Sequence, residues 1–223
     1  SGRGDSAFWI LTSGSWSART TIFQGLSVPG GGSGGGTGDN FAAGDTAYNW
    51  GPYITVPYIE GTTEPHPGRM HIGVIWRNDG VDTRSCNQLG YIYSDNYTDV
   101  YTVDGQALTL PVTPMTTACQ TGTAAGVEGY VNFGGLCIDD DGYPHMTVST
   151  SPVYHVYWDG ADWQQTTIAN PLGGVTHTNT KTAIWLRGSL WFMSQGYPAA
   201  ARIPRMWKLD GTSTVALGGD TGS

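Results

Sequence analysis

The chain has 223 residues, of which 39% are hydrophobic and 13% are charged, and it contains 34 glycines, 9 tryptophans and 12 tyrosines. Glycine, threonine and aromatic residues dominate while good helix formers are scarce, so the composition favours an all-β fold and excludes a helical bundle. The formal net charge of −8 excludes a surface suited to nucleic acid. No apolar run approaches the roughly 20 residues of a membrane-spanning helix.

Residues 1–28 are predicted to form an aromatic hairpin. Two tryptophans flank the turn-forming pair Ser13-Gly14, and a similar pattern recurs at 157–163. We interpret this segment as the outer hairpin of an earlier sheet. The glycine-rich segment 29–49 follows. It lacks the Gly-Lys-Ser/Thr ending of a phosphate-binding loop, so we expect a surface insertion there.

Three later segments repeat one pattern. Each contains a glycine turn followed by alternating apolar residues and, further on, a second turn with flanking aromatics. Such a pattern predicts antiparallel strands joined by tight turns. The predicted segments are 50–113, 127–170 and 178–217.

The recurring hairpins predict a β-propeller of four-stranded antiparallel blades, with about three to four blades in residues 1–223. A blade cannot cover both of its faces, so it needs neighbours on each side. We therefore expect an incomplete ring, which is completed either by preceding residues or by a further chain or copy. A strained small propeller is the alternative.

Several motifs together resemble those of one known family. They are a strand ending in Trp-Arg (70–77), a strand ending in Tyr-Ser-Asp (89–95) and a Leu-Pro-Val-Thr exit (110–113). In this combination the sequence resembles the BNR-repeat β-propeller family, which includes some ulvan lyases, over about residues 50–217. The scarcity of lysine and the many aromatic residues are also typical of secreted proteins, whether extracellular or virion-associated.

The resemblance implies a polysaccharide lyase-like protein that acts by β-elimination on an anionic, uronate-containing polysaccharide. Such a lyase neutralises the uronate carboxylate, removes the C5 proton and protonates the leaving oxygen. By the family's motif, Arg77 would pair with the carboxylate and Tyr53 would act as acid or base, with Tyr58 as the alternative. Family members also use histidines of an earlier blade, and that blade is missing here. A non-catalytic glycan-binding or structural module of a secreted or virion-associated complex therefore stays open.

Aromatic residues before and within the first inner strands offer faces on which sugar rings can stack. His66, in a loop between two prolines, is a further candidate, and a solvated loop is its alternative. The residues expected to bind substrate are Trp50, Tyr58, His66 and Trp76. In contrast, His71 and His145 occupy strand positions within the repeats, and we expect structural roles for them.

No cofactor is expected from the motifs. The run Asp139–Asp141 could supply oxygens to Ca²⁺, but it lacks the alternating spacing of a calcium loop, so a turn between strands is favoured. The three cysteines, Cys86, Cys119 and Cys137, allow at most one disulfide, and buried free thiols are the alternative.

Overall fold

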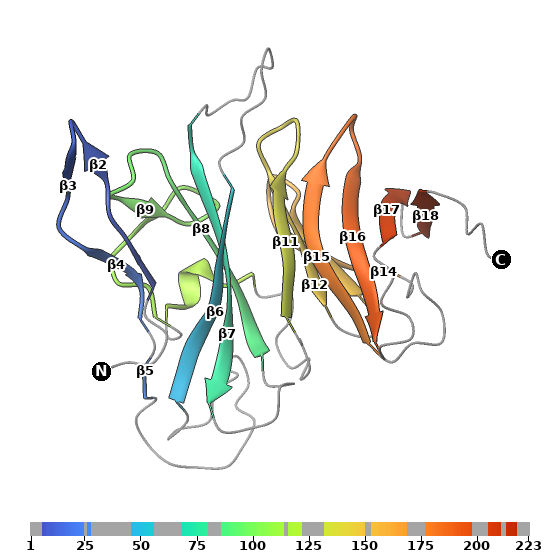
Figure 1. Cartoon of the computed structure of the whole chain (residues 1–223), viewed down its shortest axis with the longest axis horizontal. Coiled ribbons are helices and arrows are strands. Elements are labelled where there is room, and N and C mark those ends of the chain that lie inside the picture. The colour runs from blue at the N-terminus through green and yellow to red at the C-terminus, as the bar shows by residue number, and fades with distance from the viewer. Residues whose placement is uncertain are drawn as a thin grey trace. The chain divides into compact units, whose positions relative to one another are not determined.

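In the computed structural model, the described part of the chain consists almost entirely of β-strands and turns (Figure 1). The described residues are 6–24, 26–27, 46–55, 68–79, 86–113, 116–121, 132–149, 153–168, 177–197, 205–210 and 213–217. The chain divides into two compact units, which we treat separately. The first comprises Ser1–Tyr58 and His66–Gly129, and the second comprises Ile59–Pro65 and Tyr130–Ser223.

The first unit begins with a bent hairpin. Strand β1 (Ser6–Phe8) pairs antiparallel with β4 (Thr20–Phe23), and β2 (Leu11–Thr12) pairs with β3 (Ser15–Trp16) near the tip. The two tip residues, Ser13 and Gly14, have φ angles of 51° and 81°. Positive φ at both positions matches the twist of a tight two-residue hairpin turn.

A six-stranded antiparallel sheet forms the rest of the first unit. Its order is β10-β9-β8-β7-β6-β5, so each strand lies beside its neighbour in sequence. The strands are β5 (Leu26–Ser27), β6 (Thr46–Thr55), β7 (Met70–Asp79), β8 (Cys86–Ser94), β9 (Val100–Tyr101) and β10 (Ala107–Leu108). After β10, a single turn of 3-10 helix, η1, spans Thr117–Cys119.

One face of β7 forms the core of the first unit. Residues of a strand point alternately to its two faces, and the even-numbered positions of β7 carry Met70, Ile72, Val74 and Trp76. All four are buried and pack with Ile22, Phe23 and Ile92. Because the even positions fill the core, the odd positions of β7, which include Arg77, belong to the opposite face.

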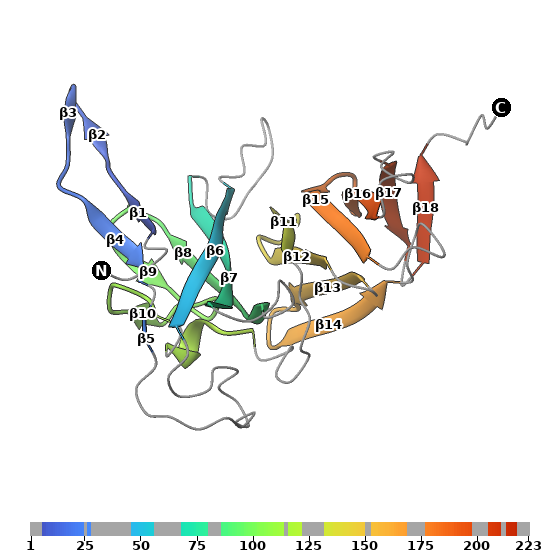
Figure 2. The ribbon, with the colours of Figure 1, turned by 60° about the horizontal axis from the view of Figure 1, so that its bottom comes forward.

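The second unit contains two four-stranded antiparallel sheets, each with its strands in sequence order (Figure 2). The first has β11 (Asn132–Ile138), β12 (Pro144–Ser149), β13 (Val153–Trp158) and β14 (Trp163–Ile168). The second has β15 (His177–Trp185), β16 (Leu190–Tyr197), β17 (Arg205–Asp210) and β18 (Ser213–Leu217). The prediction of an all-β chain with four-stranded antiparallel sheets is therefore confirmed.

The two sheets of the second unit pack directly on each other. Val153 and Ile168 of the first sheet meet Phe192 and Trp207 of the second in one buried cluster. Strand β11 also approaches β15 so closely at Gly135 that no side chain fits there. A Cβ on Gly135 would lie 2.6 Å from the carbonyl carbon of Thr182 and nearer still to the amide nitrogen of Ala183.

The strand limits differ from the sequence expectation at one place that matters for function. Strand β6 begins at Thr46, inside the segment 29–49 that was expected to be an insertion. The six-stranded sheet of the first unit also has short additional strands, β5 and β10, at its two edges. The early start of β6 extends its pairing with β7 as far as Asp79.

Candidate functional site

The strand pair β6–β7 carries two of the residues predicted to be catalytic. Because the strands are antiparallel, the start of β6 lies beside the end of β7. Arg77 stands opposite Tyr48, and Tyr53 stands opposite Gly73. Tyr53 and Arg77 thus belong to one strand pair, but four residues of β7, or about 13 Å of extended chain, separate their register positions.

Tyr48 is a candidate that sequence reasoning missed. It lies near the start of β6, directly opposite Arg77, and Trp50 follows two residues later opposite Ile75. Directly opposed residues of an antiparallel pair share one face of the sheet. Tyr48, Trp50 and Arg77 are therefore placed on the same face. The sequence signal for Tyr48 was the strand-like pattern that starts at Thr46. It was missed because the predicted insertion was extended to residue 49.

The register of β6 and β7 shifts between Trp50 and Tyr53. A bulge of this kind changes the local twist and re-aims the residues beyond it. Tyr53 is thereby separated from the regular ladder that contains Tyr48 and Trp50. The side chains of β6 and of Arg77 are outside the described part of the structure, as are all atoms of Tyr58 and His66, so the backbone register alone places this site.

Trp76 does not belong to the candidate site, and its prediction as a substrate-binding residue is wrong. Its side chain is fully buried, with 0% exposure. The indole packs edge-on against Phe23, with ring centroids 5.8 Å apart and an interplanar angle of 81°. The alternation of β7 explains the error, because residues 76 and 77 lie on opposite faces and only residue 77 can share a face with Tyr48.

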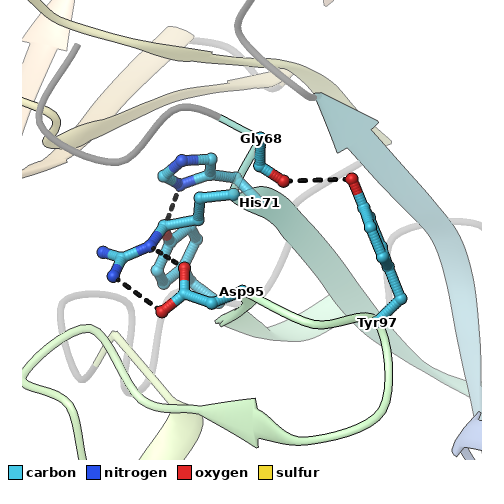
Figure 3. Close-up of polar contacts among 6 residues, drawn as sticks. Gly68, His71, Asp95 and Tyr97 are labelled. Carbon is cyan, nitrogen blue, oxygen red and sulfur yellow. Dashed lines mark hydrogen bonds and ion pairs between the residues drawn. The ribbon is translucent and has the colours of Figure 1, made fainter.

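The beginning of β7 is fixed by a second set of polar contacts, shown in Figure 3. The hydroxyl of Tyr91 lies 2.5 Å from Nδ1 of His71, and both residues are buried. Burial raises the pKa of the Tyr91 phenol, so this group keeps its proton at neutral pH. The expectation that His71 has a structural role agrees with these contacts.

Arg69 is held in the same region. Its guanidinium donates two hydrogen bonds to Asp95, at 2.7 and 3.0 Å, and lies 3.7 Å above the ring centroid of Tyr93. The guanidinium thus makes its two typical kinds of contact, a bidentate pair with a carboxylate and a cation–π contact with an aromatic ring. Arg69 is therefore committed to joining the start of β7 to the end of β8, and Arg77 remains the arginine proposed for a ligand carboxylate.

The predicted calcium alternative falls on the turn between β11 and β12. Asp139 Oδ1 accepts hydrogen bonds from the backbone N–H groups of Asp141 and Tyr143, at 3.0 and 2.7 Å. Asp139 Oδ2 contacts His145 at 3.1 Å. Both oxygens of the Asp139 carboxylate, the first possible calcium ligand of this run, thus already have hydrogen-bond partners within or beside the turn. Within the described ranges, no group of three histidine, cysteine or acidic side chains is arranged to hold a metal.

The thiols that the structure describes are free. Cys119 and Cys137 are both unpaired and buried. Burial raises the pKa of the Cys119 thiol to about 12 and also raises that of Cys137, so both groups stay protonated and unreactive.

Comparison with known proteins decides the family. The model of the BNR repeat-containing family matches residues 37–171, which is more than half of the chain. The chain belongs to the BNR repeat-containing family. The matched range includes the whole β6–β7 pair and the first sheet of the second unit, and it confirms the resemblance found in the sequence. Among curated protein sequences, none matches the chain.

Two solved structures share the fold. One is described as an ulvan lyase of a new polysaccharide lyase family, PL25, with a TM-score of 0.65 and 11% identity. The other is such an ulvan lyase bound to -[GlcA(1-4)Rha3S]-, with a TM-score of 0.64 and 12% identity. Each match covers 96% of this chain and 50% of the lyase chain, so this chain spans about half the length of its structural neighbours.

At this level of identity the similarity concerns the fold alone. This BNR-family chain is all-β and is built from antiparallel propeller blades, as predicted. Among the residues that the structure describes, no helix is long and apolar enough to cross a bilayer.

Proposed function

We propose that this chain is part of a carbohydrate-active propeller that binds an anionic, uronate-containing polysaccharide and cleaves it by β-elimination. The observation that carries the proposal is the opposed register of Tyr48 and Arg77 in a blade whose fold is shared with polysaccharide lyases. One of those lyases was solved with a glucuronate-containing ligand. A cationic and a phenolic residue on one face are two of the groups that this chemistry uses.

The roles follow from the reaction. Arg77 neutralises the uronate carboxylate, which makes the proton on C5 more acidic. Tyr48, in the place for which the sequence predicted Tyr53, takes that proton as a base. A C4–C5 double bond then forms as the C4–O bond breaks, and a proton returns to the leaving oxygen. Trp50, two residues from Tyr48 on the same strand, offers an aromatic face to a neighbouring sugar ring.

Tyr53, Tyr58 and His66 remain proposals for the outer part of the site. Tyr53 stands beyond the bulge of β6, opposite Gly73. Such a position suits contact with a sugar away from the bond that is cleaved. Tyr58 and His66 lie between β6 and β7 in the sequence and outside the described residues.

A second candidate function is glycan binding without cleavage, within a structural or assembly module. It is favoured by the extent of the match, because the chain spans about half of the lyase chains. In this case the remaining blades, on a further chain or copy, would complete the ring without adding catalytic groups. Since polysaccharides of this kind are met outside the cell, both candidates place the protein in an extracellular setting, with virion association as the narrower alternative.

We expect the full chain, incubated with a uronate-containing polysaccharide, to produce the ultraviolet absorbance of an unsaturated uronate end. A neutral polysaccharide is the control, since it has no carboxylate for Arg77 and no acidified proton. Affinity electrophoresis on the same two polymers measures binding separately. Retention by the anionic polymer without new absorbance would favour the binding module, and neither retention nor absorbance would contradict the proposed function.

A further inference from the structure

Three polar side chains form a buried line in the first sheet of the second unit. Asp139 Oδ2 lies 3.1 Å from Nε2 of His145, and Nδ1 of His145 lies 2.8 Å from Nε2 of His155. The side chains of Asp139 and His145 are only 13% and 8% exposed, and His155 is 5% exposed. The line joins the turn before β12 to the middle of β13.

Aromatic rings enclose this line. The His145 ring stacks on His155 and Tyr157 of β13, with centroids 5.0 and 5.4 Å away. It also packs at a tilt against Trp185 of β15, with the centroids 4.6 Å apart. Cys137 of β11 is the other titratable group beside Asp139, and burial keeps it neutral. Of the described groups that face the two histidines, Asp139 alone carries a charge at neutral pH.

The first unit has a similar histidine contact with a different partner. His71 stands opposite Tyr93 and bonds to Tyr91, just as His145 stands opposite Tyr157 and bonds to His155. The partner position is thus tyrosine in one sheet and histidine in the other. A tyrosine satisfies the first histidine without titrating near neutral pH, so histidine at position 155 adds a response to acid that the contact itself does not need.

Counting protons shows what acid does to the pair. Only one proton fits between two ring nitrogens 2.8 Å apart. If His145 donates to the Asp139 carboxylate through Nε2, its Nδ1 either accepts from a neutral His155 or, once protonated, donates to it. The geometry therefore has room for one extra proton beside the Asp139 carboxylate. A second would place two cations and two protons face to face.

We propose that Asp139, His145 and His155 form an acid-sensitive latch that holds β12 and β13 together and releases them when both histidines become protonated. The latch is independent of the proposed polysaccharide site on β6 and β7. Its consequence is that the second unit loses stability in mildly acidic surroundings, while Tyr91, at the corresponding position of the first unit, stays neutral over the same pH range.

The pKa values give the same direction. Burial, and then the charge of His145, lowers the pKa of His155 to about 3. A histidine in the unfolded chain has a pKa of about 6.5, so below that pH the unfolded chain binds more protons than the folded one. Stability from His155 is therefore complete above about pH 6.5 and is lost as the pH falls toward about 3. Burial tends to raise the pKa of Asp139, but its hydrogen bonds lower it further, so the net pKa is lowered. Asp139 therefore also contributes stability that is lost at low pH.

The test compares the full chain with His155→Tyr, which copies the pair of the first unit. Urea unfolding at several pH values between 6 and 4, followed by β-sheet circular dichroism, gives the folding equilibrium constant of each protein. As the pH falls, the folding constant of the parent should decrease more than that of His155→Tyr. The difference should be roughly tenfold for each pH unit, which corresponds to one extra proton bound on unfolding. Equal slopes for the two folded proteins would overturn the proposal.

A second measurement does not depend on the variant folding. In ¹⁵N NMR spectra of the parent chain, the ring nitrogens of His155 should keep the shifts of a neutral imidazole down to pH 4.5, while the fold is retained. A His155 signal that titrates near pH 6.5 in the folded protein would also overturn the latch, because the pair would then accept both protons without opening.

Discussion

Replacing Tyr48 by phenylalanine is expected to lower the rate of uronate elimination by at least about 100-fold, which is the usual minimum for loss of a general acid or base. The substitution removes one hydroxyl and keeps the ring, so strand β6 should pair with β7 as before. The rate of formation of the unsaturated product, measured at saturating substrate, reports the effect on kcat.

The matched control is Tyr53→Phe, which removes the same hydroxyl from the same strand beyond the bulge. It should leave kcat within a few-fold of the parent and act mainly on KM, because Tyr53 stands four residues of β7 away from Arg77. If Tyr53→Phe abolished turnover and Tyr48→Phe did not, the roles assigned from the register would be contradicted.

Arg77→Ala should also abolish turnover without unfolding, and an unchanged rate would remove Arg77 from the mechanism.

Gly135→Ala is expected to destabilise the second unit by about 3 kcal/mol, near the upper end of overpacking effects. The added Cβ would meet backbone atoms of Thr182 and Ala183, which belong to a paired strand and cannot rotate away as a side chain would. Strands β11 and β15 would have to separate, and with them the cluster of Cys137, Ala183 and Leu190. Urea unfolding followed by tryptophan fluorescence measures the change.

Ala107→Val serves as the control for Gly135→Ala, since it enlarges an exposed residue of the short strand β10. Exposed substitutions of this kind usually change the free energy of unfolding by less than about 0.5 kcal/mol. A Gly135→Ala protein as stable as Ala107→Val would show that the close approach of β11 to β15 is not required.

The sheets could be predicted from the sequence because their turns are marked locally. Gly14, Gly142, Gly160 and Gly188 all have positive φ, and each lies at a turn that the repeating pattern indicated. Local chemistry of this kind does not depend on distant partners. The alternation of apolar residues then gave the strands between these turns.

The candidate site was harder to predict because it depends on register. Arg77 was proposed from the family motif. Its neighbour depends on where β6 begins, and the glycine-rich segment concealed the first residues of that strand. Trp76 was chosen as an aromatic residue of a first inner strand, but the alternation of β7 places it on the face that fills the core. The choice between Tyr48 and Tyr53 thus depends on where β6 begins, and the place of Trp76 depends on the alternation of β7.

The latch was beyond the reach of the sequence for a related reason. His145 was expected to be structural from its repeat position, and its burial agrees with that expectation. Its partner His155 lies ten residues away on another strand. Only the pairing of β12 with β13 and the comparison with the pair His71 and Tyr91 show that position 155 departs from the repeat.

The most direct test of the proposed function is to observe Arg77 while a glucuronate-containing oligosaccharide is added. In NMR spectra, the Nε–Hε signal of Arg77 can be assigned by its loss in Arg77→Lys. Our account predicts that this signal and the amides of Tyr48 and Trp50 shift together as the oligosaccharide saturates the protein. Saturation that leaves these three positions unchanged, with shifts confined to other strands, would contradict it.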